Sequence, residues 1–333
     1  MQKYNIKAIG EVIVMTVSLF ALVMLGVYGY GLIQFLMFLV PLPAVIIYLK
    51  YGIKYSVIGI LIGTLLSFIF IDPRVAGLIV IMFLIPTIAF MITRKKEMNF
   101  ISTFIIMTIA YVAATIFEYT VILKIVSNTN FISIIDTIVN SSKASIDNVR
   151  KMYLDAGMNK DQVDNTLNVL RESFTKRNIL IVVPGILSII SIISSYLTCF
   201  VSERMFKRLK IKTNYEVKVY NIYINNLFLA FSIILGCIGL LLSNRNIILG
   251  DYIYETVVMV VGFWLIVTAF SLIVHYLKYK QKFKNWLIVL IVIFALFLVQ
   301  LLNYLYVAAA FIDSFVDFRK IGFKKSNKKQ GEE

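Results

Sequence analysis

The residue types that carry nucleophilic, metal and acid–base chemistry are scarce in this sequence. It has one histidine, His275, and two cysteines, Cys199 and Cys237, which lie in apolar runs without a CxxC spacing or a histidine neighbour. The patterns GxSxG, HExxH, Walker A and GxGxxG mark hydrolases, metalloproteases and nucleotide-binding proteins, and none of them occurs here. We therefore expect no enzyme active site, no metal site and no cofactor.

One carboxylate, that of Glu118, stands out because it interrupts the apolar stretch 101–125. A charge at membrane depth is costly, and such residues commonly contact a ligand, an ion or a proton path. Two interpretations stay open: a carboxylate at the water interface, or a ligand contact in an outward-facing cavity. The second takes Glu118, Tyr119 and Gln34 as ligand-binding residues. Gln34 has an alternative role, shared with Gln300 and Asn303, in hydrogen bonds between helices.

Composition predicts the environment of this carboxylate. Of the 333 residues, 60% are apolar and 15% are charged, whereas soluble domains average about 45–50% apolar and about 25% charged. One core cannot bury so much apolar surface, so lipid must cover the excess. A spanning helix needs roughly 20 apolar residues. The candidate runs are 8–30, 32–49, 53–71, 75–93, 101–125, 179–202, 222–242, 253–275 and 286–310. We predict an all-α, polytopic membrane helix bundle with about nine spans, with eight and ten as alternatives.

The second run, 32–49, is short and contains Pro41 and Pro43. A proline inside a helix removes a backbone hydrogen bond, and in a membrane the freed carbonyl must find a partner on a neighbouring helix. We expect this span to be kinked and buried among other helices.

The loop charges predict the orientation. With the N-terminus inside, the short inner loops hold 17 lysines and arginines and the short outer loops hold two. Basic residues collect on the cytoplasmic side, so we expect a cytoplasmic N-terminus. We attribute the net charge of +15 to the same bias. Nucleic-acid binding is not expected. The final apolar stretch, 286–318, is long enough for two short spans that meet near Asn303, or for one span followed by a surface helix. Nine spans would place the basic tail 319–333 outside, whereas ten would place it inside with the other basic segments.

The long hydrophilic insert 127–178 is predicted to form an extracytoplasmic helical hairpin with a turn at Gly157. Steps of three and four residues mark one apolar stripe on each helix. The first stripe is Phe131, Ile135, Ile138, Ser142, Ile146, Val149 and Tyr153, and the second is Val163, Leu167, Leu170 and Phe174. Asn159 and Gln162 resemble a capping box. The hairpin either caps the membrane bundle or forms a lid over an outward cavity.

Two charged pairs are predicted from spacing alone. Glu11 lies four residues after Lys7, which suits an ion pair on one helix face. Asp72 and Arg74 flank Pro73 in a tight connection, which suits a turn with a local ion pair.

Two stretches carry a family resemblance. PLPAVIIYLKYG at 41–52 and FIDSFVDFRK at 311–320, in this order around an outer insert, resemble the YybS-like family of bacterial membrane proteins, a domain of unknown function. The resemblance implies a multi-pass protein of the bacterial cytoplasmic membrane. It assigns no role to either motif.

That family is similar in turn to the S components of energy-coupling-factor transporters over the first six spans. This similarity implies a six-helix bundle over 1–212, including the hairpin 127–178, that binds a small molecule from outside and works with an ATPase subunit. Additional membrane helices would occupy 213–318, followed by the basic tail 319–333.

Two functions from different classes follow. The first is binding or transport of a small or lipid-like ligand, in a cavity beneath the hairpin that Glu118 and aromatic side chains line. The alternative is a non-transporting scaffold or regulatory protein. Its basic inner loops, 204–218 and 278–284, or its tail would bind a cytoplasmic partner or anionic lipid.

Overall fold

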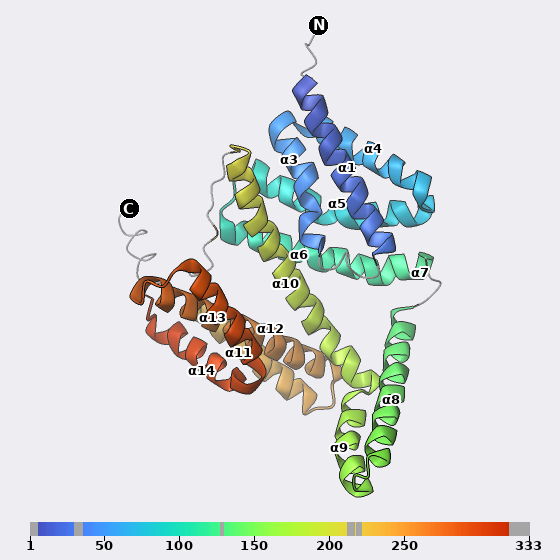
Figure 1. Cartoon of the computed structure of the whole chain (residues 1–333), viewed down its shortest axis with the longest axis vertical. Helices are drawn as coiled ribbons and strands as arrows, with labels where there is room; N and C mark the ends of the chain where they lie inside the picture. The colour runs from blue at the N-terminus through green and yellow to red at the C-terminus, as the bar shows by residue number, and fades with distance from the viewer. Residues whose placement is uncertain (1–5, 30–35, 127–129, 212–216, 218–221, 320–333) are drawn as a thin grey trace. The chain divides into compact units, whose positions relative to one another are not determined.

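The computed structural model describes residues 6–29, 36–126, 130–211, 217 and 222–319, and within these ranges it is helical without strands (Figure 1). Seven helices in these ranges are long and apolar enough to cross a membrane: Ile53–Phe70, Pro73–Lys95, Phe100–Val121, Lys176–Arg208, Asn226–Ser243, Ile248–Lys280 and Val299–Val316. Three shorter apolar helices accompany them: Ile9–Leu25, Met37–Tyr51 and Asn285–Phe297. The prediction of an all-α polytopic membrane bundle is confirmed.

The chain divides into two compact units. Unit 1 comprises Met1–Leu180 and Ile190–Val217, and unit 2 comprises Ile181–Ile189 and Lys218–Glu333. One long helix, α10 (Lys176–Arg208), contributes residues to both units. The predicted domain boundary between residues 212 and 213 lies outside the described residues.

Unit 1 is built around the short helix α3 (Pro41–Tyr51), whose first seven residues are all buried. Its burial was predicted, but the kink was not found, because the helix begins at the prolines. Pro41 occupies the first turn, where a missing N–H costs no helical hydrogen bond. A short 3₁₀ turn, η1 (Met37–Leu39), precedes it. Gly52, at φ +89°, turns the chain into the next helix.

Helices α1 (Ile6–Tyr28), α4 (Ile53–Phe70) and α5 (Pro73–Lys95) pack around α3, and α6 (Phe100–Phe117) packs against α5. Small residues let α4 approach its neighbours closely, as is common in membrane bundles. They are Ser56, Gly59, Gly63 and Ser67, all buried. The Ser56 hydroxyl donates to the carbonyl of Ala44 at 2.8 Å, which joins α4 to α3.

The insert forms the predicted hairpin of α8 (Phe131–Asp155) and α9 (Lys160–Ser173), with Gly157 in the turn at φ +81° (Figure 1). Its buried stripe is narrower than predicted and consists of Ile135, Val139, Ile146, Val163 and Leu167. Five residues of the predicted stripes are exposed instead: Ile138, Val149, Tyr153, Leu170 and Phe174. Two helices bury only the residues along their single shared seam, so a wider stripe stays uncovered. In the described residues the two helices of the hairpin pack mainly on each other. A cap over the membrane bundle and a lid over an outward cavity both stay predictions.

Asn159 caps the start of α9, as predicted, and its side-chain oxygen accepts from the backbone N–H of Asp161 at 2.8 Å. Asp72 plays the same role for α5. Its carboxylate accepts from the backbone N–H of Arg74 at 2.8 Å, so a helix cap takes the place of the predicted ion pair.

Ion pairs hold the two hairpin helices together, and one of them predicts a pH dependence. Arg150 Nε donates to Asp164 at 2.5 Å, and this hydrogen bond lowers the pKa of Asp164 below its ordinary value of 3.8. A carboxylate with a lowered pKa in the folded state stabilises the fold above its unfolded pKa. The contribution is lost as the pH falls through the folded pKa, so the hairpin should loosen below about pH 4.

Asp164→Asn should produce the same loosening at neutral pH. We expect backbone amide exchange in α8 and α9 to become a few-fold faster, with the membrane helices unchanged, as measured by hydrogen–deuterium exchange mass spectrometry. Asp155→Asn, at an exposed hairpin position, is the matched control. Equal acceleration by both substitutions would contradict a role for the Arg150–Asp164 pair.

Unit 2 contains α11 (Asn226–Ser243), α12 (Ile248–His275), α13 (Asn285–Phe297) and α14 (Val299–Val316). Helices α11 and α12 form a tight hairpin in which glycines meet the opposing backbone. A Cβ added at Gly239 would lie 2.8 Å from the backbone nitrogen of Tyr254. Close approach of this kind needs a residue without a side chain.

The last apolar stretch, for which two short spans were one predicted alternative, is two helices that meet at Leu298, and Leu302 is a further non-helical residue within α14. The hydroxyl of Tyr306 in α14 donates to the carbonyl of Ala295 in α13 at 3.1 Å, which brings the two helices together across the break. The described residues therefore contain ten apolar helices, seven long and three short.

Candidate functional site

Glu118 is the first residue of a π-helical turn, η2 (Glu118–Ile122), that follows α6. Such turns are rare and often mark functional positions, because the wider turn re-aims side chains. The Glu118 side chain is half-buried within the apolar span Phe100–Val121. Among the described residues, no hydrogen bond or ion pair reaches its carboxylate.

Tyr119 follows Glu118 in the same turn, and its ring meets that of Phe131, the first residue of α8. The ring centroids lie 5.4 Å apart with planes at 70°, an edge-to-face contact. The hairpin thus starts beside the π turn. Gln34, the third predicted ligand residue, lies outside the described residues. Of the predicted set, the structure therefore describes an adjacent pair, Glu118 and Tyr119.

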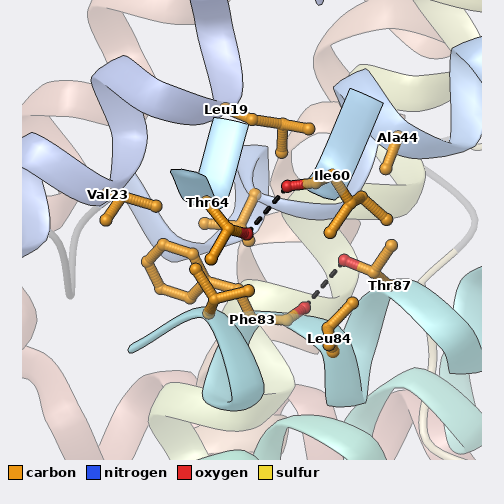
Figure 2. Close-up of a pocket in the computed structure, with 10 residues that line it drawn as sticks. Leu19, Val23, Ala44, Ile60, Thr64, Phe83, Leu84 and Thr87 are labelled. Atoms are coloured by element: carbon orange, nitrogen blue, oxygen red, sulfur yellow. Dashed lines mark hydrogen bonds between the residues drawn. The ribbon is translucent and has the colours of Figure 1, made fainter. Parts of the chain in front are cut away.

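Unit 1 has a partly open pocket of about 30 Å³, room for one water-sized molecule, between α1, α3, α4 and α5 (Figure 2). Thr64 and Thr87 are its polar lining residues. Their hydroxyls donate to the carbonyls of Ile60 and Phe83, each at 2.7 Å, so neither hydroxyl needs a partner in the cavity. Glu118 and Tyr119 do not line it. It is not the ligand chamber that the sequence led us to expect.

Two charged side chains, Arg94 and Glu203, form buried polar contacts near helix ends. Arg94 is buried at the end of α5, where its guanidinium donates to Thr103 Oγ1 and to the carbonyl of Met98. Glu203, also buried, accepts from Lys207 Nζ at 2.6 Å and from the backbone N–H of Val217 at 2.8 Å. Each contact ties a basic connection to the end of a membrane helix.

Glu11 makes a tertiary contact in place of the predicted one. Its carboxylate accepts from Lys50 Nζ at 2.6 Å, which joins α1 to the end of α3. Lys7, the partner expected from spacing, has a side chain outside the described set. Pairing of opposite charges four residues apart applies within one helix. Here a neighbouring helix supplies the cation instead.

The most buried ion pair joins Asp313 and Arg319. Arg319 Nη2 lies 2.7 Å from Asp313 Oδ2, and the two side chains are 1% and 2% exposed. Arg319 Nη1 also donates to the carbonyl of Ile222 at 2.9 Å and to Ser271 Oγ at 2.8 Å. Asp317 has the left-handed conformation, φ +47°, and this reversal turns the chain after α14 back toward Asp313. Both charged residues belong to the FIDSFVDFRK motif.

The remaining candidates are structural. Cys199 is buried and Cys237 exposed, and both are free thiols. The ring of His275, at the end of α12, packs against that of Tyr279 with centroids 4.9 Å apart. Among the described residues, no cluster of three or more metal-ligating side chains occurs. Glu255, in α12, is a second carboxylate within a span, which the sequence analysis passed over.

Comparison with known protein families matches residues 17–314 to the family described as Predicted membrane protein (DUF2232). The chain belongs to this family. The DUF2232 match begins in α1 and ends in α14, so it includes Glu118 and Asp313 and stops before Arg319. No curated protein and no solved structure matches the chain. The DUF2232 family and the apolar helices together establish a multi-pass membrane protein.

Proposed function

We propose that this membrane protein binds a small or lipid-like ligand that carries a positive charge, with Glu118 as its counter-charge. The observation that carries the proposal is a half-buried carboxylate at a π-helical turn, without a hydrogen bond or ion pair from the described residues. A carboxylate removed from water is costly unless a cation accompanies it. A bound ammonium group would supply that charge.

The neighbouring rings indicate the rest of the ligand. Tyr119 and Phe131 meet edge to face next to Glu118 and offer both apolar area and ring faces. Ring faces attract cations within about 6 Å of the centroid. The chemistry that fits this turn is therefore a cationic head with an apolar body.

The packing of unit 1 favours a site on the surface of α6 over a closed chamber. The partly open pocket of unit 1 is water-sized and mostly apolar, so it suits neither a vitamin nor a nucleotide. Side chains such as Ile109 and Ile116 of α6 are exposed and face lipid when the span lies in a membrane. A lipid-like molecule reaches such a site from the bilayer itself.

A role in uptake is a stronger form of the proposal. It draws support from the resemblance to the YybS-like family and to S components of energy-coupling-factor transporters, and it adds an ATPase subunit as partner. The accompanying location is the bacterial cytoplasmic membrane with a cytoplasmic N-terminus, which the positive-inside bias supports. In this orientation Glu118 lies toward the outer surface.

The test is mass spectrometry of the lipids and metabolites that copurify with the full chain in mild detergent. We expect one cationic molecule to be enriched with the wild type and reduced about tenfold or more in Glu118→Gln, since a buried charge-assisted hydrogen bond contributes about 1.5–3 kcal/mol. The substitution keeps the shape of the side chain and removes its charge.

Glu255→Gln is the matched control because Glu255 is also a half-buried carboxylate within a span, but in a regular α-helix. It should leave the copurified profile unchanged. Identical profiles for wild type and Glu118→Gln, in well-folded samples, would overturn the proposed site.

The second candidate function is a non-transporting scaffold or regulatory protein that binds through its basic loops. The water-sized cavity of unit 1 and the exposed Arg204, Lys207, Arg208 and Lys210 favour it. A pull-down from membranes distinguishes the two. Recovery of an ATPase module supports uptake, whereas recovery of membrane enzymes or envelope proteins supports the scaffold.

A further inference from the structure

The two broad faces of the α8–α9 hairpin differ in charge. One face carries three ion pairs, which join Arg150 to Asp164, Arg171 to Asp147, and Lys176, the first residue of α10, to Asp136. Residues of this face in α8 recur at steps of seven, four and three: Asp136, Lys143, Asp147 and Arg150. We call it the ion-pair face.

The opposite face carries no charged residue. In α8 its residues recur at steps of three and four: Ile134, Ile138, Ser142, Ser145, Val149 and Met152. In α9 the corresponding residues are Thr166, Val169, Leu170 and Ser173. At about 3.6 residues per turn, each set lies across its helix from the ion pairs, and the buried seam runs between the two faces. We call this the uncharged face.

Apolar side chains on the uncharged face are exposed. Met152 is 70% exposed and Val169 is 65% exposed, and Ile138 and Leu170 are exposed as well. Monomeric proteins rarely leave a contiguous apolar patch of more than a few hundred Å² in water, and a larger patch commonly marks an interface. The uncharged face therefore has the character of a contact surface.

The hydroxyl groups of this face do not need a partner from outside. Three of them donate to the carbonyl four residues earlier in their own helix, each at 2.9 Å: those of Ser145, Thr166 and Ser173. Burying a hydroxyl group without a hydrogen bond is costly, whereas a hydroxyl bonded to its own helix keeps its partner when water is excluded. These side chains can therefore enter a dry interface.

The charges of the hairpin argue against a bilayer surface as the occupant. Helices that lie on a membrane surface carry lysine and arginine on the polar face that borders the apolar one. In the hairpin, Arg150, Arg171 and Lys176 are instead paired with aspartates on the ion-pair face. The uncharged face thus fits a partner surface that is itself apolar and uncharged.

A second copy of this chain offers such a surface. In a twofold contact the same patch lies on both partners, so an uncharged face brings no like charges together. The full chain has a net charge of +15, whereas the segment 130–178 has seven basic and six acidic residues. Two copies repel each other least where they meet through this nearly neutral segment.

The size of the uncharged face suffices for a specific dimer. Helix α8 has 25 residues and α9 has 14, so their lengths are about 37 and about 21 Å at a width of about 10 Å each. Each copy then contributes roughly 600 Å², and a dimer buries roughly 1,200 Å², the lower end of the range for specific protein interfaces. We propose that the uncharged face binds the same face of a second copy, so that two hairpins form a twofold-symmetric four-helix contact.

Disulfide crosslinking of the full chain in membranes tests this contact. Residues near a twofold axis meet their own counterparts. In a chain with Cys199→Ala and Cys237→Ala, we expect an added oxidant to produce covalent dimers from at least one of Ser142→Cys, Ser145→Cys and Val149→Cys. Asn140→Cys is the matched control, because Asn140 is exposed and lies four residues after Asp136 on the ion-pair face. It should give no more dimer than the cysteine-free chain. Equal crosslinking from both faces, or none from the uncharged face, would overturn the proposal.

A charge placed on the uncharged face provides an independent test. Val149→Glu puts a carboxylate from each copy into the contact. We expect the dimer, measured by fluorescence energy transfer between labelled copies in liposomes, to become at least about tenfold weaker, since an unpaired buried charge is costly. Asn140→Glu makes the same change in charge on the ion-pair face and should leave the energy transfer unchanged.

Two results of these measurements would contradict self-association. An equal loss of energy transfer in Val149→Glu and Asn140→Glu would show an effect of net charge alone. A monomeric chain in which Val149→Cys is shielded from an impermeant maleimide would show that a bilayer or another protein covers the face. Either result would overturn the second copy as the occupant.

Discussion

Replacing Arg319 by methionine is expected to lower the apparent Tm of the detergent-purified protein by roughly 10 °C. The substitution leaves the Asp313 carboxylate, whose side chain is 2% exposed, without its cation. Breaking a buried ion pair from one side costs about 3–5 kcal/mol. In a domain of 150–250 residues, each kcal/mol shifts the Tm by roughly 2–4 °C. Intrinsic fluorescence at one fixed heating rate measures the change.

Two further variants make this prediction specific to burial. In the double variant Asp313→Leu and Arg319→Met no unpaired charge remains, so most of the lost stability should return. Arg171→Met breaks an ion pair with Asp147 whose side chains are 39% and 57% exposed, and it should shift the Tm by only a few degrees at most. A small effect of Arg319→Met, similar to that of Arg171→Met, would show that the Asp313–Arg319 ion pair contributes little to stability.

Gly250→Ala should destabilise unit 2 to a similar degree. A Cβ at Gly250 would lie 2.6 Å from the carbonyl oxygen of Gly239 and 2.7 Å from the carbonyl carbon of Leu242. These are main-chain atoms of α11, which cannot move aside as the end of a flexible side chain would. Inserting an atom into a packed structure typically costs about 1–3 kcal/mol of stability. We expect Gly250→Ala to cost about 3 kcal/mol, because the atoms in the way belong to the backbone. The same fluorescence measurement reports the lowered Tm.

Gly262→Ala is the control within the same helix. No atom lies within 4 Å of a Cβ built at Gly262, and alanine favours a helix by about 1 kcal/mol over glycine. Its Tm should be equal to or higher than that of the wild type. A lowered Tm in Gly262→Ala, equal to that in Gly250→Ala, would indicate a general intolerance of α12 rather than close packing against α11.

Helix positions could be predicted well from this sequence because they depend on local properties. Apolar runs of spanning length identified the membrane helices, and Gly157 between two amphipathic stretches identified the hairpin. A break in the last apolar stretch was one predicted alternative, near Asn303, but its position at Leu298 was not predicted, since no proline or glycine marks it. It depends instead on the return of α14 to α12, a tertiary arrangement.

The pairing of charges could not be predicted for a related reason. Spacing rules consider neighbours on one helix, but Lys50 reaches Glu11 from another helix, 39 positions along the chain. Asp313 and Arg319 are six residues apart, which is not a helical pairing distance. Their contact requires the left-handed conformation of Asp317. An aspartate at this position does not by itself predict that conformation from sequence.

The candidate ligand site was predicted in part. Glu118 was singled out because a carboxylate within a span is unusual, and that argument needs only sequence. No pattern in the sequence predicts the π-helical turn that begins at Glu118. The outward cavity expected beneath the hairpin was suggested by the family resemblance, and in the described residues α8 and α9 pack mainly on each other instead.

The length of α13 has a consequence for the lipids around it. Its 13 residues extend over only about 20 Å, against about 30 Å for the hydrocarbon core of a typical bilayer. Large side chains such as Phe294 and Phe297 remain exposed on it. Where a helix of this length crosses a bilayer, the hydrocarbon layer beside it must become thinner, because hydrophobic mismatch of this kind thins the bilayer locally. Membranes with shorter acyl chains should accommodate the protein at a lower elastic cost than thick ones.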